Sequence, residues 1–191
     1  MAQQTWQTLV NAYSYSGTNV GTTYENSETL TDISPGGAVA GQALTFPAGY
    51  LQVGHIIRWT AKGWFSTTGK PTLTLGLYYG GTTGTALAKS ASMETPATVT
   101  ELPWVLEATT RVVVAGEKAK LVTQGHIAGL ITPAEEGSKG VTIGFLPASK
   151  PQTEVEVNGS LANAATLGAK WGTKSASNKI AVTQWLIEIL D

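Results

Sequence analysis

The side chains that most often carry acid–base or metal chemistry are sparse in this sequence. His55 and His126 are its only histidines, and each lies in an alternating stretch with no second histidine or carboxylate at metal-ligand spacing. A histidine in such a stretch is usually structural, so we expect neither to form a catalytic or metal site. Asp32 and Asp191 are the only aspartates, which leaves no Asp-rich calcium loop.

Two pairs of glutamates are the candidates for a glycosidase site, which needs two carboxylates roughly 5 to 9 Å apart across a cleft. One pair is Glu101 with Glu107, and the other is Glu154 with Glu156. Both pairs also fit solvated positions on strands and loops, and we favour that interpretation.

Other catalytic motifs are missing from the sequence. It has no Gly-x-Ser-x-Gly elbow, and residues 68–71 (TGKP) form a turn instead of a phosphate-binding loop, because Pro71 stands where that loop needs a hydroxyl. The absence of cysteine excludes disulfides, thiolate metal sites and a cysteine nucleophile. We therefore predict a protein that is not an enzyme and that needs no cofactor.

Composition points to a single all-β domain. The chain has 191 residues, of which only 13% are charged and 22 are glycine, and its formal net charge is −1. A chain of this length can bury a core without disulfides, and a net charge near zero gives no footprint for nucleic acid. Neither a signal peptide nor an apolar run long enough for a membrane helix is found, so we expect no membrane partner.

The central stretch of the sequence, residues 54–81, has the period of two that is typical of half-buried strands. Its two arms flank a turn at 66–71 that contains Gly69 and Pro71, which predicts a β-hairpin. Long strands are also expected at 102–114, 121–131 and 180–190. Gly125 and Gly129 are expected to mark bulges or close approaches within the second of these.

About ten strands at short spacing predict a jelly-roll-like antiparallel β-sandwich. Residues 1–26 are polar with conspicuous aromatics, so we expect an extended N-terminal arm there and a sandwich over 27–191. The aromatic residues of the arm either anchor it to a partner or cover one edge of the sandwich. They are Trp6, Tyr13, Tyr15 and Tyr24.

Three segments carry a resemblance to a known group of proteins: 66–81 (STTGKPTLTLGLYYGG), 102–107 (LPWVLE) and 171–180 (WGTKSASNKI). In these segments the chain resembles structural proteins of tailed bacteriophages, and among them the jelly-roll proteins that decorate, or cement, the phage head. The resemblance implies a virion component made in the host cytoplasm that binds the phage major capsid protein on the outer capsid surface and stabilises the head. It also implies a homo-oligomer, for which a trimer is favoured. We expect the aromatic arm to form the interface, because buried aromatic residues carry much of the binding energy of protein interfaces.

Two alternatives stay open. The first is a carbohydrate-binding module, in which Trp64, Tyr78 and Tyr79 form an exposed platform for sugar rings, unless these side chains pack against a second layer or another subunit. The second is a tail or fibre component, although the sequence shows neither a fibre repeat nor a coiled coil.

Overall fold

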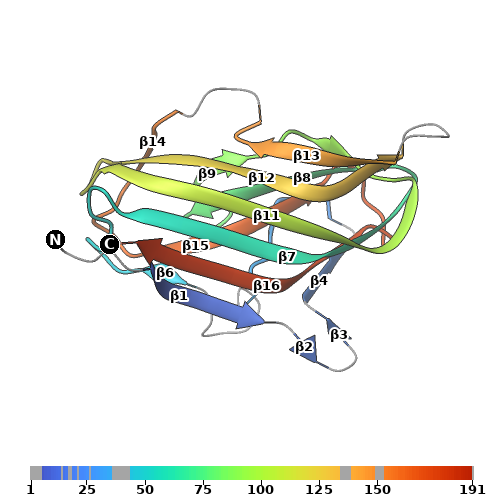
Figure 1. Cartoon of the computed structure of the whole chain (residues 1–191), viewed down its shortest axis with the longest axis horizontal. Coiled ribbons are helices and arrows are strands. Elements are labelled where there is room, and N and C mark those ends of the chain that lie inside the picture. Colours follow the sequence, from blue (N-terminus) through green and yellow to red (C-terminus); the bar gives the residue numbers. More distant parts are fainter. Residues whose placement is uncertain are drawn as a thin grey trace.

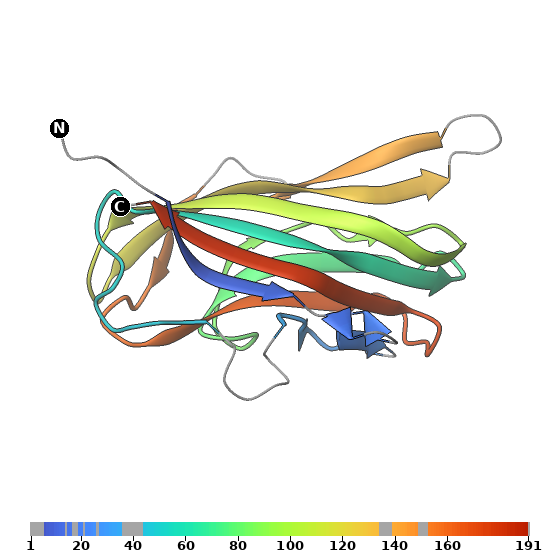
Figure 2. The same ribbon diagram turned by 60° about the horizontal axis from the view of Figure 1, so that its bottom comes forward.

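The protein is a sandwich of two antiparallel β-sheets, as the computed structural model shows (Figures 1 and 2). The structure describes residues 6–13, 15–16, 19–20, 22–25, 27–35, 44–133, 139–148 and 153–190. Every strand pairing among these residues is antiparallel, and none of them lies in a helix. The all-β sandwich predicted from the sequence is confirmed. Within the same ranges, no helix is long and apolar enough to cross a membrane.

The larger sheet has eight strands. They are β1 (Trp6–Tyr13), β4 (Thr22–Glu25), β7 (Ile56–Thr68), β11 (Thr98–Val114), β12 (Ala119–Pro133), β13 (Lys139–Leu146), β14 (Val155–Val157) and β16 (Lys179–Leu190). Their order is β1-β16-β7-β11-β12-β13, with β4 added beside β16 and β14 beside β12. The four long strands β16, β7, β11 and β12 therefore lie side by side.

The smaller sheet covers one face of the larger one. Its strands are β5 (Thr31–Asp32), β6 (Thr45–Phe46), β8 (Thr72–Tyr79), β9 (Thr85–Lys89), β10 (Met93–Glu94) and β15 (Asn163–Trp171), in the order β10-β8-β15-β5, with β6 beside β15 and β9 beside β8. A short ribbon of β2 (Tyr15–Ser16) and β3 (Asn19–Val20) completes the described strands.

The predicted hairpin over 54–81 is wrong. Its first arm, β7, pairs with β11 and β16 in the larger sheet, whereas its second arm, β8, pairs with β15, β9 and β10 in the smaller sheet. Both arms carry an apolar face, and a hairpin would place the two faces side by side. Crossing between the sheets instead turns them toward each other, so that each covers the other.

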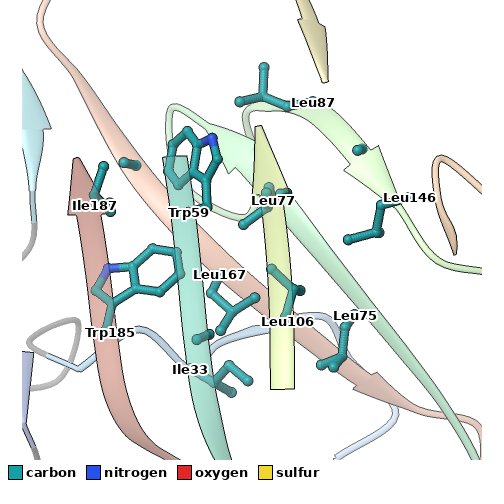
Figure 3. Packing of buried hydrophobic residues seen from close by; sticks show 14 of the residues in the cluster. Ile33, Trp59, Leu75, Leu77, Leu87, Leu106, Leu146, Leu167, Trp185 and Ile187 are labelled. Carbon is teal, nitrogen blue, oxygen red and sulfur yellow. The ribbon is translucent and has the colours of Figure 1, made fainter. Parts of the chain in front are cut away.

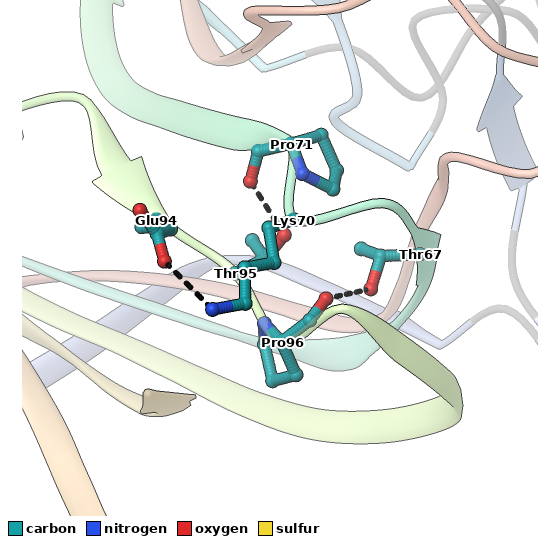
Figure 4. A network of polar contacts seen from close by, with 6 residues as sticks. All are labelled: Thr67, Lys70, Pro71, Glu94, Thr95 and Pro96. Atoms are coloured by element: carbon teal, nitrogen blue, oxygen red, sulfur yellow. Dashed lines mark hydrogen bonds and ion pairs between the residues drawn. The ribbon is translucent and has the colours of Figure 1, made fainter. Parts of the chain in front are cut away.

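Buried hydrogen bonds hold the corner where the chain crosses between the sheets (Figure 4). Thr67 Oγ1 donates to the Pro96 carbonyl oxygen at 2.7 Å, and Thr95 Oγ1 donates to the Pro71 carbonyl oxygen at 2.6 Å. At the surface, Lys70 Nζ lies 4.0 Å from a Glu94 carboxylate oxygen. The segment before β11 is thereby tied to both ends of the corner.

Indole rings and leucines fill the space between the sheets (Figure 3). Trp59 and Trp185 come from neighbouring strands of the larger sheet and are fully buried, and their ring centroids lie 6.0 Å apart. Leu75, Leu77 and Leu167 come from the smaller sheet and have no exposed surface. The core is therefore continuous from one sheet to the other.

The two glycines singled out in 121–131 behave as predicted. Gly129 has a φ of +102° at a register shift between β12 and β13, which is a bulge. Gly125 lies against β11 so closely that an added Cβ would come within 2.4 Å of the Ala108 Cβ. Both positions thus need glycine for reasons of backbone geometry.

The N-terminal segment extends the larger sheet. Strand β1 pairs with residues 184–190 of β16, and β4 pairs with residues 179–182 of the same strand. Together they cover the outer edge of β16 along most of its length. The division into an arm over 1–26 and a sandwich over 27–191 stays a prediction.

A buried hydrogen-bond chain in the core gives a test of this packing. Trp59 Nε1 donates to Thr110 Oγ1 at 2.8 Å, and Thr110 Oγ1 shares a second bond of 2.8 Å with Thr123 Oγ1. Thr110→Val should lower the free energy of unfolding by about 1 to 3 kcal/mol, because it leaves a buried indole N–H without an acceptor.

The matched control is Thr109→Val, one residue away on the exposed face of the same strand, which should change stability by less than about 0.5 kcal/mol. Urea denaturation of both variants measures the difference. Equal losses would show that the buried hydrogen bond is not what stabilises this part of the core.

Candidate functional site

A polar groove of about 720 Å³ lies on the face of the larger sheet that points away from the core. Four neighbouring strands supply its lining. The side chains with hydrogen-bonding groups are Arg58, Thr60 and Lys62 from β7, Glu107 and Thr109 from β11, Gln124 and His126 from β12, and Gln184 and Glu188 from β16. The alternation along each strand explains this set, because the intervening residues face the core.

Strand register places these side chains in transverse rows. In one row His126 pairs with Glu107, Glu107 with Thr60, and Thr60 with Leu186. The next row contains Gln124, Thr109, Arg58 and Glu188, and a third joins Lys62 to Gln184. Directly opposed residues lie about 5 Å apart, so the rows form one continuous polar surface.

The charges that line the groove are balanced. Arg58 Nη1 lies 3.3 Å from Glu188 Oε2, and this pair occupies one end of the groove. Lys62 and Glu107 add one charge of each sign on the two central strands. The groove therefore presents both donors and acceptors without a net field of one sign.

An exposed aromatic ring lies beside the groove. Phe145 on β13 pairs in register with His126 and is 65% exposed, and Ile143, two residues earlier, is 54% exposed. Phe145 thus offers a flat apolar surface next to the polar row that His126 begins. No motif in the sequence points to either residue.

A second, smaller hollow of about 380 Å³ lies toward the other end of β7. Its lining is rich in hydroxyl groups, with Trp64 and Glu101 as its aromatic and acidic members. The remaining residues are Ser66, Thr67, Thr68, Thr98, Val99, Thr100, Ser177 and Lys179. Lys179 Nζ lies 3.1 Å from Glu25 Oε2, so the positive charge of the hollow is paired.

A bulge in β11 shapes this second hollow. The register between β11 and β7 shifts between Val99 and Leu102, and within the shift Glu101 has a φ of +51°. The Glu101 N–H donates to Ser66 Oγ at 3.0 Å, which holds the bulge against β7. A residue other than glycine is strained when its backbone adopts the left-handed conformation, and such strain is concentrated at functional sites.

The two histidines have different surroundings. His126 lines the groove, whereas His55 lies outside it, where its Nδ1 accepts a hydrogen bond of 3.3 Å from the Gln52 N–H and its ring meets Tyr50 edge-on. Within the described residues, no group of three His, Asp or Glu side chains is placed to hold a metal ion.

All four glutamates of the two candidate pairs are exposed, in line with the solvated positions that we favour from the sequence, and Glu101 and Glu107 do not line the same hollow. Glu107 lines the groove and Glu101 the second hollow, which puts about 20 Å of extended strand between them. Glu154 Oε2 instead accepts a hydrogen bond of 2.8 Å from Lys120 Nζ. That bond is the main reason the pKa of Lys120 is raised.

The proposed aromatic platform of Trp64, Tyr78 and Tyr79 does not exist. Tyr79 packs in the core, stacked on Phe46, and is 4% exposed. Tyr78 lies on the outer side of the smaller sheet and is 5% exposed, with its ring over Gly168. Burial raises the pKa of both tyrosines. Only Trp64 remains on the face that carries the groove.

The aromatic residues assigned to a capsid or subunit interface are spread over three strands. Trp6 and Tyr13 belong to β1, Tyr15 to β2 and Tyr24 to β4. Tyr24 is partly buried against the core, and this burial, with the nearby charge of Asp32, raises its pKa. The side chains of the other three lie outside the described residues, and the interface stays a prediction.

Comparison with known proteins gives little further guidance. No protein-family model and no curated protein matches the chain. One solved structure that matches is the CBM2 module of Lactobacillus casei BL23 phage J-1 evolved Dit, with 10% identity and a TM-score of 0.37 over 98% of this chain and 97% of that one. Similarity at this level identifies neither a shared fold nor a shared function, so we draw no conclusion from it.

The strained bulge gives a prediction for the second hollow. Glu101→Gly should have a free energy of unfolding up to about 1 kcal/mol above that of Glu101→Ala, because both lose the carboxylate and only glycine is unstrained at this φ. Chemical denaturation of the two variants measures the difference. A less stable glycine variant would contradict a strained backbone at this position.

Proposed function

We propose that this chain is a non-catalytic carbohydrate-binding module and that the groove on the outer face of the larger sheet is its binding site. The observation that carries the proposal is the row structure of the groove, in which amide, carboxylate, guanidinium, imidazole and hydroxyl groups from four strands line one surface. A carbohydrate-binding module is one of the alternatives that the sequence left open, but the proposed site is the groove and not the platform of Trp64, Tyr78 and Tyr79.

The chemistry of the groove favours sugars over other classes of ligand. A nucleic acid would need clustered Lys and Arg, but Arg58 is paired with Glu188, and Lys62 is matched by Glu107. A lipid or apolar cofactor would need an apolar pocket, and Leu186 and Ala108 are the apolar residues of this lining.

Sugar hydroxyls are at once donors and acceptors, and neighbouring hydroxyls occur in pairs. An amide such as that of Gln124 or Gln184 contains both donor and acceptor groups, and the Glu107 carboxylate can accept from two hydroxyls together. Thr60 and Thr109 add hydroxyls that can rotate to either role. A ring lying over the central row would therefore meet partners for several of its hydroxyls.

Phe145 supplies the apolar part of the proposed site. Its exposed ring lies next to His126 at the β13 side of the groove. The C–H groups on one side of a sugar ring form an apolar surface that can pack on an aromatic face. Polar rows with an aromatic at their edge would fix both the position and the orientation of a sugar.

The direct test is binding to a glycan array and to purified cell-wall polysaccharides, followed by calorimetry on the strongest hit. Glu107→Ala should weaken that binding at least tenfold, because the variant removes charge-assisted hydrogen bonds worth about 1.5 to 3 kcal/mol. The matched control is Glu117→Ala, an exposed glutamate on the turn before β12, which should leave affinity unchanged.

Absence of binding to every glycan tested would overturn the proposal, as would equal losses in the Glu107 and Glu117 variants. Thermal unfolding of both variants shows whether a loss of binding reflects a loss of folding.

The place of the module on a virion is a separate proposal, which rests on the sequence resemblance to phage structural proteins. Capsid decoration, with the major capsid protein as partner and a trimeric state, stays a prediction, as does a tail or fibre position. Immunogold labelling of particles distinguishes these locations: label around the heads supports decoration, whereas label confined to tails supports a receptor-binding role for the groove.

A further inference from the structure

The groove and the second hollow are lined by successive outward side chains of one strand. Along β7, Arg58, Thr60 and Lys62 line the groove, and Trp64, Ser66 and Thr68 line the hollow. Because side chains on one face of a strand recur every second residue, these six residues form a single file. Trp64 is the first member of the file that belongs to the hollow.

The two sites also have related chemistry. The hollow offers the hydroxyls of Thr98, Thr100 and Ser177, the Glu101 carboxylate and one aromatic ring, whereas the groove offers amides, carboxylates and the ring of Phe145. In both, a positive side chain is paired with a glutamate: Arg58 with Glu188 in the groove, and Lys179 of the hollow with Glu25. Both therefore suit a neutral, polyhydroxylated ligand.

The bulge in β11 forms one wall of the hollow. It lies beside Ser66, and the hydrogen bond from the Glu101 N–H to Ser66 Oγ fixes the backbone there. The register of β16 on β7 also shifts, between Val182 and Gln184, at the level of Gly63 and Lys62. The sheet thus changes its local geometry where the groove gives way to the hollow.

We infer that the ligand is a linear oligosaccharide that lies along β7, with one part in the groove and its continuation in the hollow against Trp64. This inference rests on the proposed function and adds the direction and minimum length of the glycan. From Thr60 to Ser66 the strand extends about 20 Å, so a ligand that fills both sites must span at least that distance.

The test uses ladders of chito-, cello- and manno-oligosaccharides, from disaccharide to hexasaccharide, with affinity measured by calorimetry against the intact protein. We expect short members of one ladder to bind in the groove and affinity to rise at least tenfold at the length that reaches the hollow. Trp64→Ala should remove this rise while leaving the affinity for the short members unchanged.

A second variant tests the same inference with the Trp64 side chain in place, so that a local change of structure at Trp64 cannot decide the result. Thr100→Lys places a long side chain at an exposed position of the hollow and should likewise remove the rise with length. The control is Thr85→Lys, at an exposed position of β9 in the smaller sheet, which should bind like the wild type.

The outcomes separate the two proposals. If no ladder binds, the proposed function fails together with the inference. If short and long members bind equally well, or if Trp64→Ala weakens all lengths to the same extent, the groove still binds glycans but the inference of an extended site along β7 is overturned.

Discussion

The structure depends on the burial of two apolar strand faces against each other. The inward side chains of β7 and β8 are buried, and Trp59, Leu75 and Leu77 among them have no exposed surface. These strands are consecutive in the chain and belong to different sheets, so the corner between them brings the two layers together. Thr67 and Thr95 bond to backbone carbonyls at that corner, which satisfies groups that burial would otherwise leave unpaired.

This arrangement leaves the two outer faces with different roles. On the smaller sheet, the Tyr78 ring closes over Gly168 and Leu30 lies nearby, so this part of the face is covered by the chain itself. On the larger sheet, four long strands lie side by side with polar residues outward. A wide polar surface of this kind is stable without a ligand because it is solvated, and it can exchange that water for sugar hydroxyls at modest cost.

Irregular backbone lies at the ends of this surface and the regular ladder at its centre. The bulges near Glu101 and at Gly129 change the local twist of β11 and β12, and the Glu101 conformation is one that a non-glycine residue adopts only when its surroundings hold it there. The central rows from His126 to Leu186 rest on uninterrupted pairing between β12, β11, β7 and β16. Rigid strands therefore position the polar groups, and the bulge near Glu101 shapes the hollow beside them.

Alternation of apolar and polar residues determined much of the fold from the sequence alone. It located β7, β8, the long strand β11 and the last strand β16, and the glycines of β12 marked its bulge and its close approach to β11. It also showed that residues such as Arg58, Thr60 and Lys62 face away from the core. A period of two defines the two faces of a strand and carries no information about which strand lies next to it.

Tertiary structure alone decided the pairing. Whether β7 and β8 form a hairpin or face each other across the core depends on contacts with β11, β15 and β16, which come from distant parts of the chain. The same long-range pairing places Glu107, Gln124 and Gln184 beside Lys62 and Thr60, and it buries Tyr78 and Tyr79, which looked available in the sequence. The site is formed by strands that are neighbours in the sheet. The sequence does not reveal it, because burial of apolar faces over the whole core decides which strands become neighbours.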